Sequence, residues 1–153
     1  MYTYKYPRAA LTVDAIVFVK SEVKTSVLLI ERGREPFKNK WALPGGFVDM
    51  DEILEQACIR ELEEETGLQV DQMKQFRAYD AINRDPRHRT ISVVYSVELE
   101  EQRPVKGSDD AAQAKWFPID DLPELAFDHA EILADFFNPD NSFDYRNKQV
   151  SPG

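Results

Sequence analysis

The sequence predicts an α+β fold, and three observations support this. Two apolar runs, Ala15–Val19 and Val27–Ile30, have the length of buried strands. Two other segments place apolar residues at helical spacing. These strand-like and helix-like segments follow one another without a regular βαβ repeat. Such a mixture is typical of an α+β sandwich, in which helices pack on a sheet.

Length and composition predict one domain over residues 1–153. The chain has 153 residues, of which 42% are hydrophobic, enough for a sizeable core. Residues 139–153 are polar and are expected to form a C-terminal tail. Apolar runs stay far below the roughly 18 residues of a membrane span, so no membrane association is expected. Cys58 is the single cysteine, which excludes an internal disulfide and leaves the cytoplasm as the default location.

The charge balance limits the class of partner. The net charge is −9, and an acidic surface repels phosphate backbones, so nucleic acid is not an expected partner. An anionic small molecule would need local arginines or bound cations to approach this surface.

The first half of the chain predicts strands followed by one helix. Pro44-Gly45-Gly46 marks a tight bend, and Asp49 or Asp51 is the expected N-cap of the helix. This helix runs to about Thr66, and Gly67 closes it. Strands are predicted over residues 10–20, 26–32 and 46–48.

The second half predicts further strands and a last helix. The helix covers Phe127–Phe137, with His129 in its first turn, and Pro139 ends it. A charged loop, Asn83–Arg89, separates two of the strands. Strands are predicted over residues 75–81, 90–98 and 115–119.

The first helix carries acidic residues on an unexpected face. At about 100° per residue, Glu61, Glu64 and Glu65 continue the apolar stripe toward the interior. The apolar part of that stripe is formed by Leu54, Ala57 and Cys58. Like charges three and four residues apart repel, and the C-terminal end of a helix disfavours negative charge. Either the acids are a solvated helix end, or a hard cation such as Mg²⁺ compensates them, since Arg60 alone cannot.

The spacing of this region resembles a known motif. The chain reads Gly46, five residues, Glu52, seven residues, Arg60-Glu61-Leu62, one residue, Glu64-Glu65, one residue, Gly67-Leu68. This pattern matches the Nudix box at every defined position. The resemblance implies the Nudix fold, a mixed β-sheet sandwiched between helices (an α/β/α sandwich). It also implies hydrolysis of a nucleoside diphosphate linked to another moiety, with Mg²⁺ or Mn²⁺ as cofactor.

The resemblance also implies roles for single residues. Glu61, Glu64 and Glu65 would be metal ligands and catalytic residues, assisted by the carbonyl of Gly45. Arg60 would orient Glu64 or a neighbouring acid, and Glu52 would support the loop. Asp110, or its neighbour Asp109, stands where other Nudix enzymes carry a distal acid that assists catalysis.

The flanking segments resemble small bacterial and archaeal ADP-ribose pyrophosphatases. The segments that carry this likeness include "KWALPGGFVD", "NRDPRHRTISVVY" and "ELAFDHAEIL". Arg32, Arg84 and Arg87 are the predicted substrate-binding residues, because guanidinium groups suit phosphate; the alternative is a solvated loop or pairing with Asp80 or Asp85. Four aromatic residues are candidates for stacking on a base, although each is more often core: Phe37, Trp41, Tyr79 and Phe127.

The predicted function is hydrolysis of ADP-ribose to AMP and ribose 5-phosphate. A nucleoside-triphosphate pyrophosphohydrolase is the alternative enzyme, and a non-catalytic ADP-ribose sensor is the alternative from another class. The family resemblance further implies a homodimer.

Overall fold

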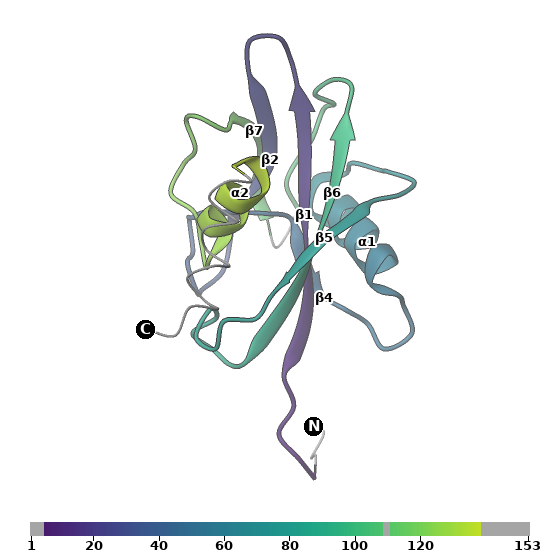
Figure 1. Ribbon diagram of the computed structural model, residues 1–153, viewed down its shortest axis with the longest axis vertical. Coiled ribbons are helices and arrows are strands. Elements are labelled where there is room, and N and C mark those ends of the chain that lie inside the picture. The colour runs from purple at the N-terminus through teal and green to yellow at the C-terminus, as the bar shows by residue number, and fades with distance from the viewer. Residues whose placement is uncertain (1–4, 109–110, 139–153) are drawn as a thin grey trace.

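The computed structural model describes residues 5–108 and 111–138, so Asp109, Asp110 and the predicted tail lie outside the described residues. In this part of the chain, seven strands form one mixed sheet and two helices accompany it (Figure 1). The strands are β1 (Ala10–Lys20), β2 (Thr25–Arg32), β3 (Trp41–Ala42), β4 (Gly45–Phe47), β5 (Lys74–Tyr79), β6 (Thr90–Leu99) and β7 (Ala111–Pro118). The helices are α1 (Leu54–Thr66) and α2 (His129–Phe137).

Strand β1 organises the sheet because it has partners along both edges. One edge pairs in parallel with β6 along ten residues, from Ala10 opposite Thr90 to Val19 opposite Leu99. The other edge is shared: β4 pairs antiparallel with the beginning of β1, and β2 pairs antiparallel with its end. The strand order is β3-β2-β1-β6-β5, and β7 pairs with β2.

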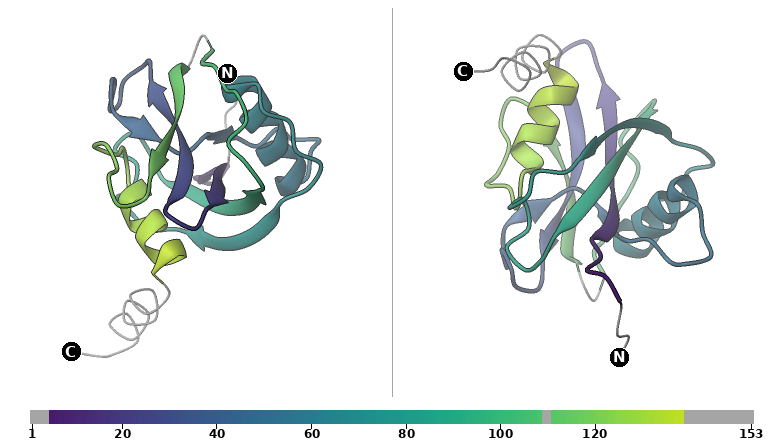
Figure 2. Two further views of the ribbon diagram at one scale, coloured as in Figure 1. Left: turned by 90° about the horizontal axis from the view of Figure 1, so that it is seen from above. Right: turned by 60° about the horizontal axis from the view of Figure 1, so that its bottom comes forward.

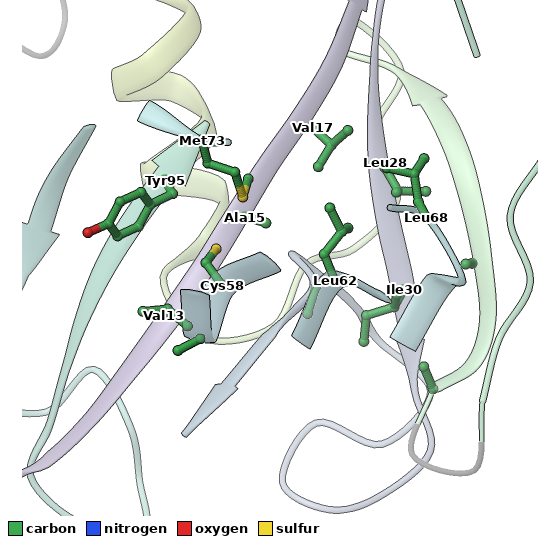
Figure 3. Close-up of a cluster of buried hydrophobic side chains, with 14 of the residues drawn as sticks. Val13, Ala15, Val17, Leu28, Ile30, Cys58, Leu62, Leu68, Met73 and Tyr95 are labelled. Carbon is green, nitrogen blue, oxygen red and sulfur yellow. The ribbon is translucent and has the colours of Figure 1, made fainter. Parts of the chain in front are cut away.

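The two faces of the sheet each bury a separate hydrophobic cluster. Successive side chains of a strand point to opposite faces. Val13, Ala15 and Val17 therefore pack in the cluster that contains Cys58 and Leu62 of α1 (Figure 3). Ile16 and Phe18 pack in the other cluster, with Ile132 and Leu133 of α2. Figure 2 shows α1 and α2 on opposite sides of the sheet, as the predicted sandwich requires.

Burial on both faces explains why β1 reads as a continuous apolar run. Cys58 is fully buried in this core, and burial raises the pKa of its thiol, which makes it an unreactive core residue.

The predicted elements are confirmed with small shifts, apart from two local errors. Strand β3 was not predicted, because two residues carry no periodic signal. The N-cap prediction is wrong: α1 begins at Leu54 with Ile53 as N-cap, and no side chain caps it. The physical reason is that Asp49 and Asp51 lie in a turn before the helix, where the Glu52 carboxylate accepts the N–H of Asp49 at 2.8 Å.

The end of α1 is as predicted. Gly67 adopts a left-handed conformation, with φ of 76°, and its N–H donates to the carbonyl of Glu63. Neither helix in the described part of the chain has the length and apolar character that a membrane crossing needs.

Candidate active site

One cavity of about 430 Å³ collects most of the predicted site residues. It lies where β1, β2 and β4 meet α1, the loop between β5 and β6, and the residues before α2. Seven predicted residues line it: Gly45, Glu61, Glu64, Glu65, Arg32, Arg84 and Arg87. Segments that are far apart in the sequence therefore supply acids and arginines to one space.

The three acids of α1 differ in environment. Glu65 and Glu61 are partly buried, whereas the Glu64 side chain is 57% exposed. The inward orientation predicted for Glu64 is therefore wrong, because Glu64 lies at the edge of the buried stripe and its carboxylate reaches solvent. Glu65 accepts a hydrogen bond from the Gly45 N–H at 2.7 Å.

Burial perturbs the titration of the two inner acids. It raises the pKa of Glu65 to about 8, with smaller contributions from the charges of Glu61 and Asp14. It also raises the pKa of Glu61. Perturbed carboxylates in a cleft are typical of functional sites.

Arg60 connects the acids to the loop before the helix. Its Nε and Nη2 form a two-point contact with Glu52, at 3.0 and 2.6 Å. Its Nη1 donates to Glu61 at 2.8 Å and to Glu64 at 3.2 Å. The hydrogen bonds from Arg60 lower the pKa of Glu52 to about 2. Arg60 thus contacts Glu64 and the neighbouring Glu61, the acids that it is predicted to orient.

Gly46 leaves room for the Glu61 carboxylate. A Cβ at this position would lie 2.5 Å from the Glu61 carboxyl carbon. Gly45 is constrained in a different way, since a Cβ there would overlap the carbonyl oxygen of Val13 in β1. Gly46 therefore makes room for an acid of the site, and Gly45 allows β4 to lie close to β1.

The two arginines of the "RDPR" stretch have different partners. Arg84 is 4% exposed, and its Nε and Nη2 donate to both oxygens of Asp128, at 2.9 and 2.6 Å. Arg87 donates to Asp85 from Nε at 3.1 Å and from Nη2 at 2.8 Å, and its side chain remains 40% exposed. Arg87 thus stays accessible to a ligand, whereas Arg84 joins the loop to the start of α2.

Phe127 and Phe47 are the two phenylalanines among the residues that line the cavity, and Phe127 is the one that contacts arginines. Its ring lies 4.9 Å from the Arg32 guanidinium and 5.9 Å from that of Arg87. An edge contact with Phe37, at 4.8 Å between centroids, holds the ring. Of the four aromatic residues named as stacking candidates, Phe127 alone lines the cavity.

Asp14 and His129 form a buried polar pair that lines the cavity and that the sequence did not single out. Asp14 accepts a hydrogen bond from the Ser92 hydroxyl, and its other oxygen lies 3.7 Å from Nε2 of His129. His129 accepts the Leu43 N–H at Nδ1, so the neutral ring carries its proton on Nε2. Burial lowers the pKa of His129. A lone aspartate inside the apolar run "TVDAIVFV" was the available signal.

The acids fit a hard divalent cation by their chemistry, but they are not gathered around one point. Within residues 5–108 and 111–138, no three His, Cys, Asp or Glu side chains form a ready-made metal site. The reason is that Arg60 holds Glu61 and Glu64 while the Gly45 N–H holds Glu65. Glu65 is nevertheless partly buried, its bonded partner among the described residues is the neutral Gly45 N–H, and a metal ion would compensate its charge.

Comparison with known proteins agrees with this geometry. The NUDIX domain family model matches residues 10–136. The chain belongs to the Nudix family. An ADP-ribose pyrophosphatase of Methanocaldococcus jannaschii is 40% identical over 131 residues, which cover 86% of this chain and 75% of that protein. The ADPR responsive transcriptional repressor NtrR of Acinetobacter baylyi is 32% identical over 86% of this chain, and the match spans 54% of the repressor.

Solved Nudix structures have the same fold. The NUDIX domain of Shewanella oneidensis NrtR, complexed with ADP ribose, superposes with a TM-score of 0.82 at 32% identity, over 90% of this chain and 93% of that one. A bifunctional NMN adenylyltransferase/ADP ribose pyrophosphatase from Francisella tularensis, complexed with AMP and Mn ion, gives a TM-score of 0.78 at 30% identity. That match covers 89% of this chain and 43% of the Francisella chain. The predicted Nudix fold is confirmed.

Proposed function

We propose that this Nudix protein hydrolyses the pyrophosphate bond of ADP-ribose to AMP and ribose 5-phosphate, with Mg²⁺ or Mn²⁺ as cofactor. The observation that carries the proposal is that one cavity contains both the box glutamates and a wall of arginines around an aromatic ring. The similarity to an ADP-ribose pyrophosphatase and to a domain complexed with ADP ribose supports the substrate class.

The acids are the proposed metal ligands. Glu61, Glu64 and Glu65, with the carbonyl of Gly45, would hold the cation. The Mn ion in the Francisella structure supports a divalent cofactor in this family. Such a cation neutralises charge on a pyrophosphate and lowers the pKa of a coordinated water.

The chain's own groups would then position the reactants. The two-point contact with Glu52 fixes the Arg60 guanidinium, which in turn orients Glu61 and Glu64. The Gly45 N–H orients Glu65. A distal acid at Asp110, outside the described residues, remains a prediction, as do a homodimer and a cytoplasmic location.

Arginines that line the cavity would bind the substrate phosphates. Arg32 and Arg87 present guanidinium groups to the cavity, and the protein needs such local cations because its net charge is −9. Arg84 was predicted in the same role, but its guanidinium is engaged by Asp128, so Arg87 is the stronger candidate of the two.

A product assay tests the proposal. The full chain is incubated with ADP-ribose, other nucleoside diphosphate sugars, dinucleotides and nucleoside triphosphates, with Mg²⁺ or Mn²⁺, and the products are separated by chromatography. We expect kcat/KM for ADP-ribose to exceed that for dGTP, 8-oxo-dGTP and ATP by at least about tenfold, or ~1.4 kcal/mol. Faster release of pyrophosphate from a triphosphate would instead assign the protein as a nucleoside-triphosphate pyrophosphohydrolase.

A second candidate function is an ADP-ribose sensor, which the similarity to the repressor favours. Binding of ADP-ribose without turnover under all metal conditions would establish this alternative. The complete match to the Nudix box favours the enzyme.

A further inference from the structure

Two guanidinium groups approach one phenyl ring in the cavity wall. Arg32 comes from the end of β2, Arg87 from the loop between β5 and β6, and Phe127 from the segment before α2. Phe127 has a positive φ of 52°, which is uncommon for a bulky residue, and Phe37 packs against its edge. The backbone turn and this contact present the ring to both arginines.

Each guanidinium is anchored by one edge. The Nε of Arg32 donates to the Pro36 carbonyl at 2.7 Å. The Nε and Nη2 of Arg87 donate to Asp85, as described above. Among the described residues, no hydrogen bond engages either terminal nitrogen of Arg32 or the Nη1 of Arg87. These donors are available to a ligand in the cavity.

Asp85 fixes Arg87 through both its backbone N–H and its guanidinium. The same carboxylate accepts the backbone N–H of Arg87 at 2.9 Å and a hydrogen bond from the Thr90 hydroxyl at 3.3 Å. Its side chain is only 3% exposed. Although burial acts in the opposite direction, the hydrogen bonds from Arg87 lower the pKa of Asp85 to about 2. Asp85 is therefore a buried, fixed anion whose main partner is Arg87.

The two guanidiniums lie close enough to repel one another. Burial and then the charge of Arg87 lower the pKa of Arg32, whereas the charges of nearby acids, Glu65 first, act in the opposite direction. Among the described residues, Asp85 bonds the Arg87 guanidinium, and Arg32 is bonded to a neutral carbonyl and not to a carboxylate. An anion that accepts hydrogen bonds from both would relieve the repulsion, and a phosphoryl group offers several acceptor oxygens in a suitable geometry.

We infer that Arg32 and Arg87 together bind one phosphoryl group of the ligand beside the Phe127 ring, and that Asp85 is the positioning residue of this site. This inference rests on the proposed function for the identity of the ligand. Arg84 is not part of this phosphoryl site, because both of its hydrogen bonds go to Asp128 and join the loop to the start of α2.

A double-mutant cycle tests the inference without turnover. The probe is the ADP-ribose analogue in which a methylene group replaces the bridging oxygen, and its Kd is measured by calorimetry with EDTA present. The variants are Asp85→Asn, Arg87→Ala and the double variant, with Arg103→Ala as control. Arg103 carries the same charge but does not line the cavity. Asparagine keeps an oxygen that can accept the Arg87 N–H, so the loop turn is retained.

We expect Arg87→Ala to raise Kd about tenfold and Asp85→Asn to raise it about fivefold. In the Arg87→Ala background, Asp85→Asn should have less than about a twofold effect, because a positioning residue acts through its partner. Arg103→Ala should stay within about twofold of the parent.

Other outcomes overturn the inference. An unchanged Kd for Arg87→Ala, or no binding of the probe to the parent protein at millimolar concentration, removes the phosphoryl site. Equal effects of Asp85→Asn in both backgrounds show that Asp85 supports the loop as a whole. If the cycle behaves as expected but ADP-ribose is not hydrolysed with metal, the proposed enzymatic function fails and the phosphoryl site stands.

Discussion

Replacing Glu65 by glutamine should stabilise the protein when metal is removed. Glu65 has a pKa of about 8 in the folded protein, against an ordinary value of 4.5. The unfolded chain therefore loses this proton more readily than the folded one, so stability falls as pH rises from 4.5 to 8. At pH 7 this difference in pKa lowers the free energy of unfolding by as much as about 3 kcal/mol. For a domain of this size that is roughly 8 °C in Tm.

The glutamine variant removes the charge and keeps the contact. Its amide oxygen can still accept the Gly45 N–H that Glu65 accepts at 2.7 Å. The control is Glu63→Gln on the same helix, because Glu63 is exposed and its carboxylate contacts the Gln69 side chain at the surface. Glu64→Gln should not share the gain, since Glu64 is exposed and bonded to Arg60.

Thermal melting from pH 5 to pH 8.5 in EDTA is the assay. The Tm of Glu65→Gln should exceed that of the parent by an amount that grows with pH, while the Glu63→Gln curve follows the parent. Added Mg²⁺ should raise the Tm of the parent more than that of Glu65→Gln, because the ligand binds the folded state through the ionised acid. Parallel curves for the parent and Glu65→Gln at all pH values would refute the idea that burial destabilises this carboxylate.

Four further variants address the glycines and the buried ion pair. Gly46→Ala should lower kcat/KM at least about tenfold with a small change in Tm, because the new methyl group displaces the Glu61 carboxylate. Gly45→Ala should unfold the protein, because its methyl group clashes with the backbone of β1. Similar melting of the two variants would contradict this. Arg84→Ala should cost about 3 kcal/mol in urea unfolding, because it leaves Asp128 without its buried partner. The double variant Arg84→Ala/Asp128→Ala should recover part of that loss, and additive effects would count against a coupled pair.

The sequence by itself determined the parts of this protein that depend on neighbouring residues. Helical spacing places Glu61 and Glu65 on the inner side of α1, and Gly67 ends the helix because glycine readily adopts the left-handed conformation of a C-cap. The apolar runs identified β1 and β2 because a short apolar run is typical of a buried strand. The box also identified the family, which the family comparison confirms.

Local patterns were insufficient where the partner is distant in the chain. The pairing of β1 with β6 joins residues about 80 positions apart, and Arg84 finds Asp128 instead of the nearby acids. Sequence spacing cannot state which of several carboxylates a guanidinium will reach, because the answer depends on how the loop and α2 pack.

The tertiary structure alone decided the composition of the cavity. It brought Asp14 and His129 together, although β1 and α2 lie at opposite ends of the described chain. It also places the Arg87 guanidinium near the Phe127 ring and buries Asp85, which bonds that guanidinium. These contacts exist because the sheet and the two packed helices bring distant segments to one place, and a single buried carboxylate then fixes the orientation of its cationic partner.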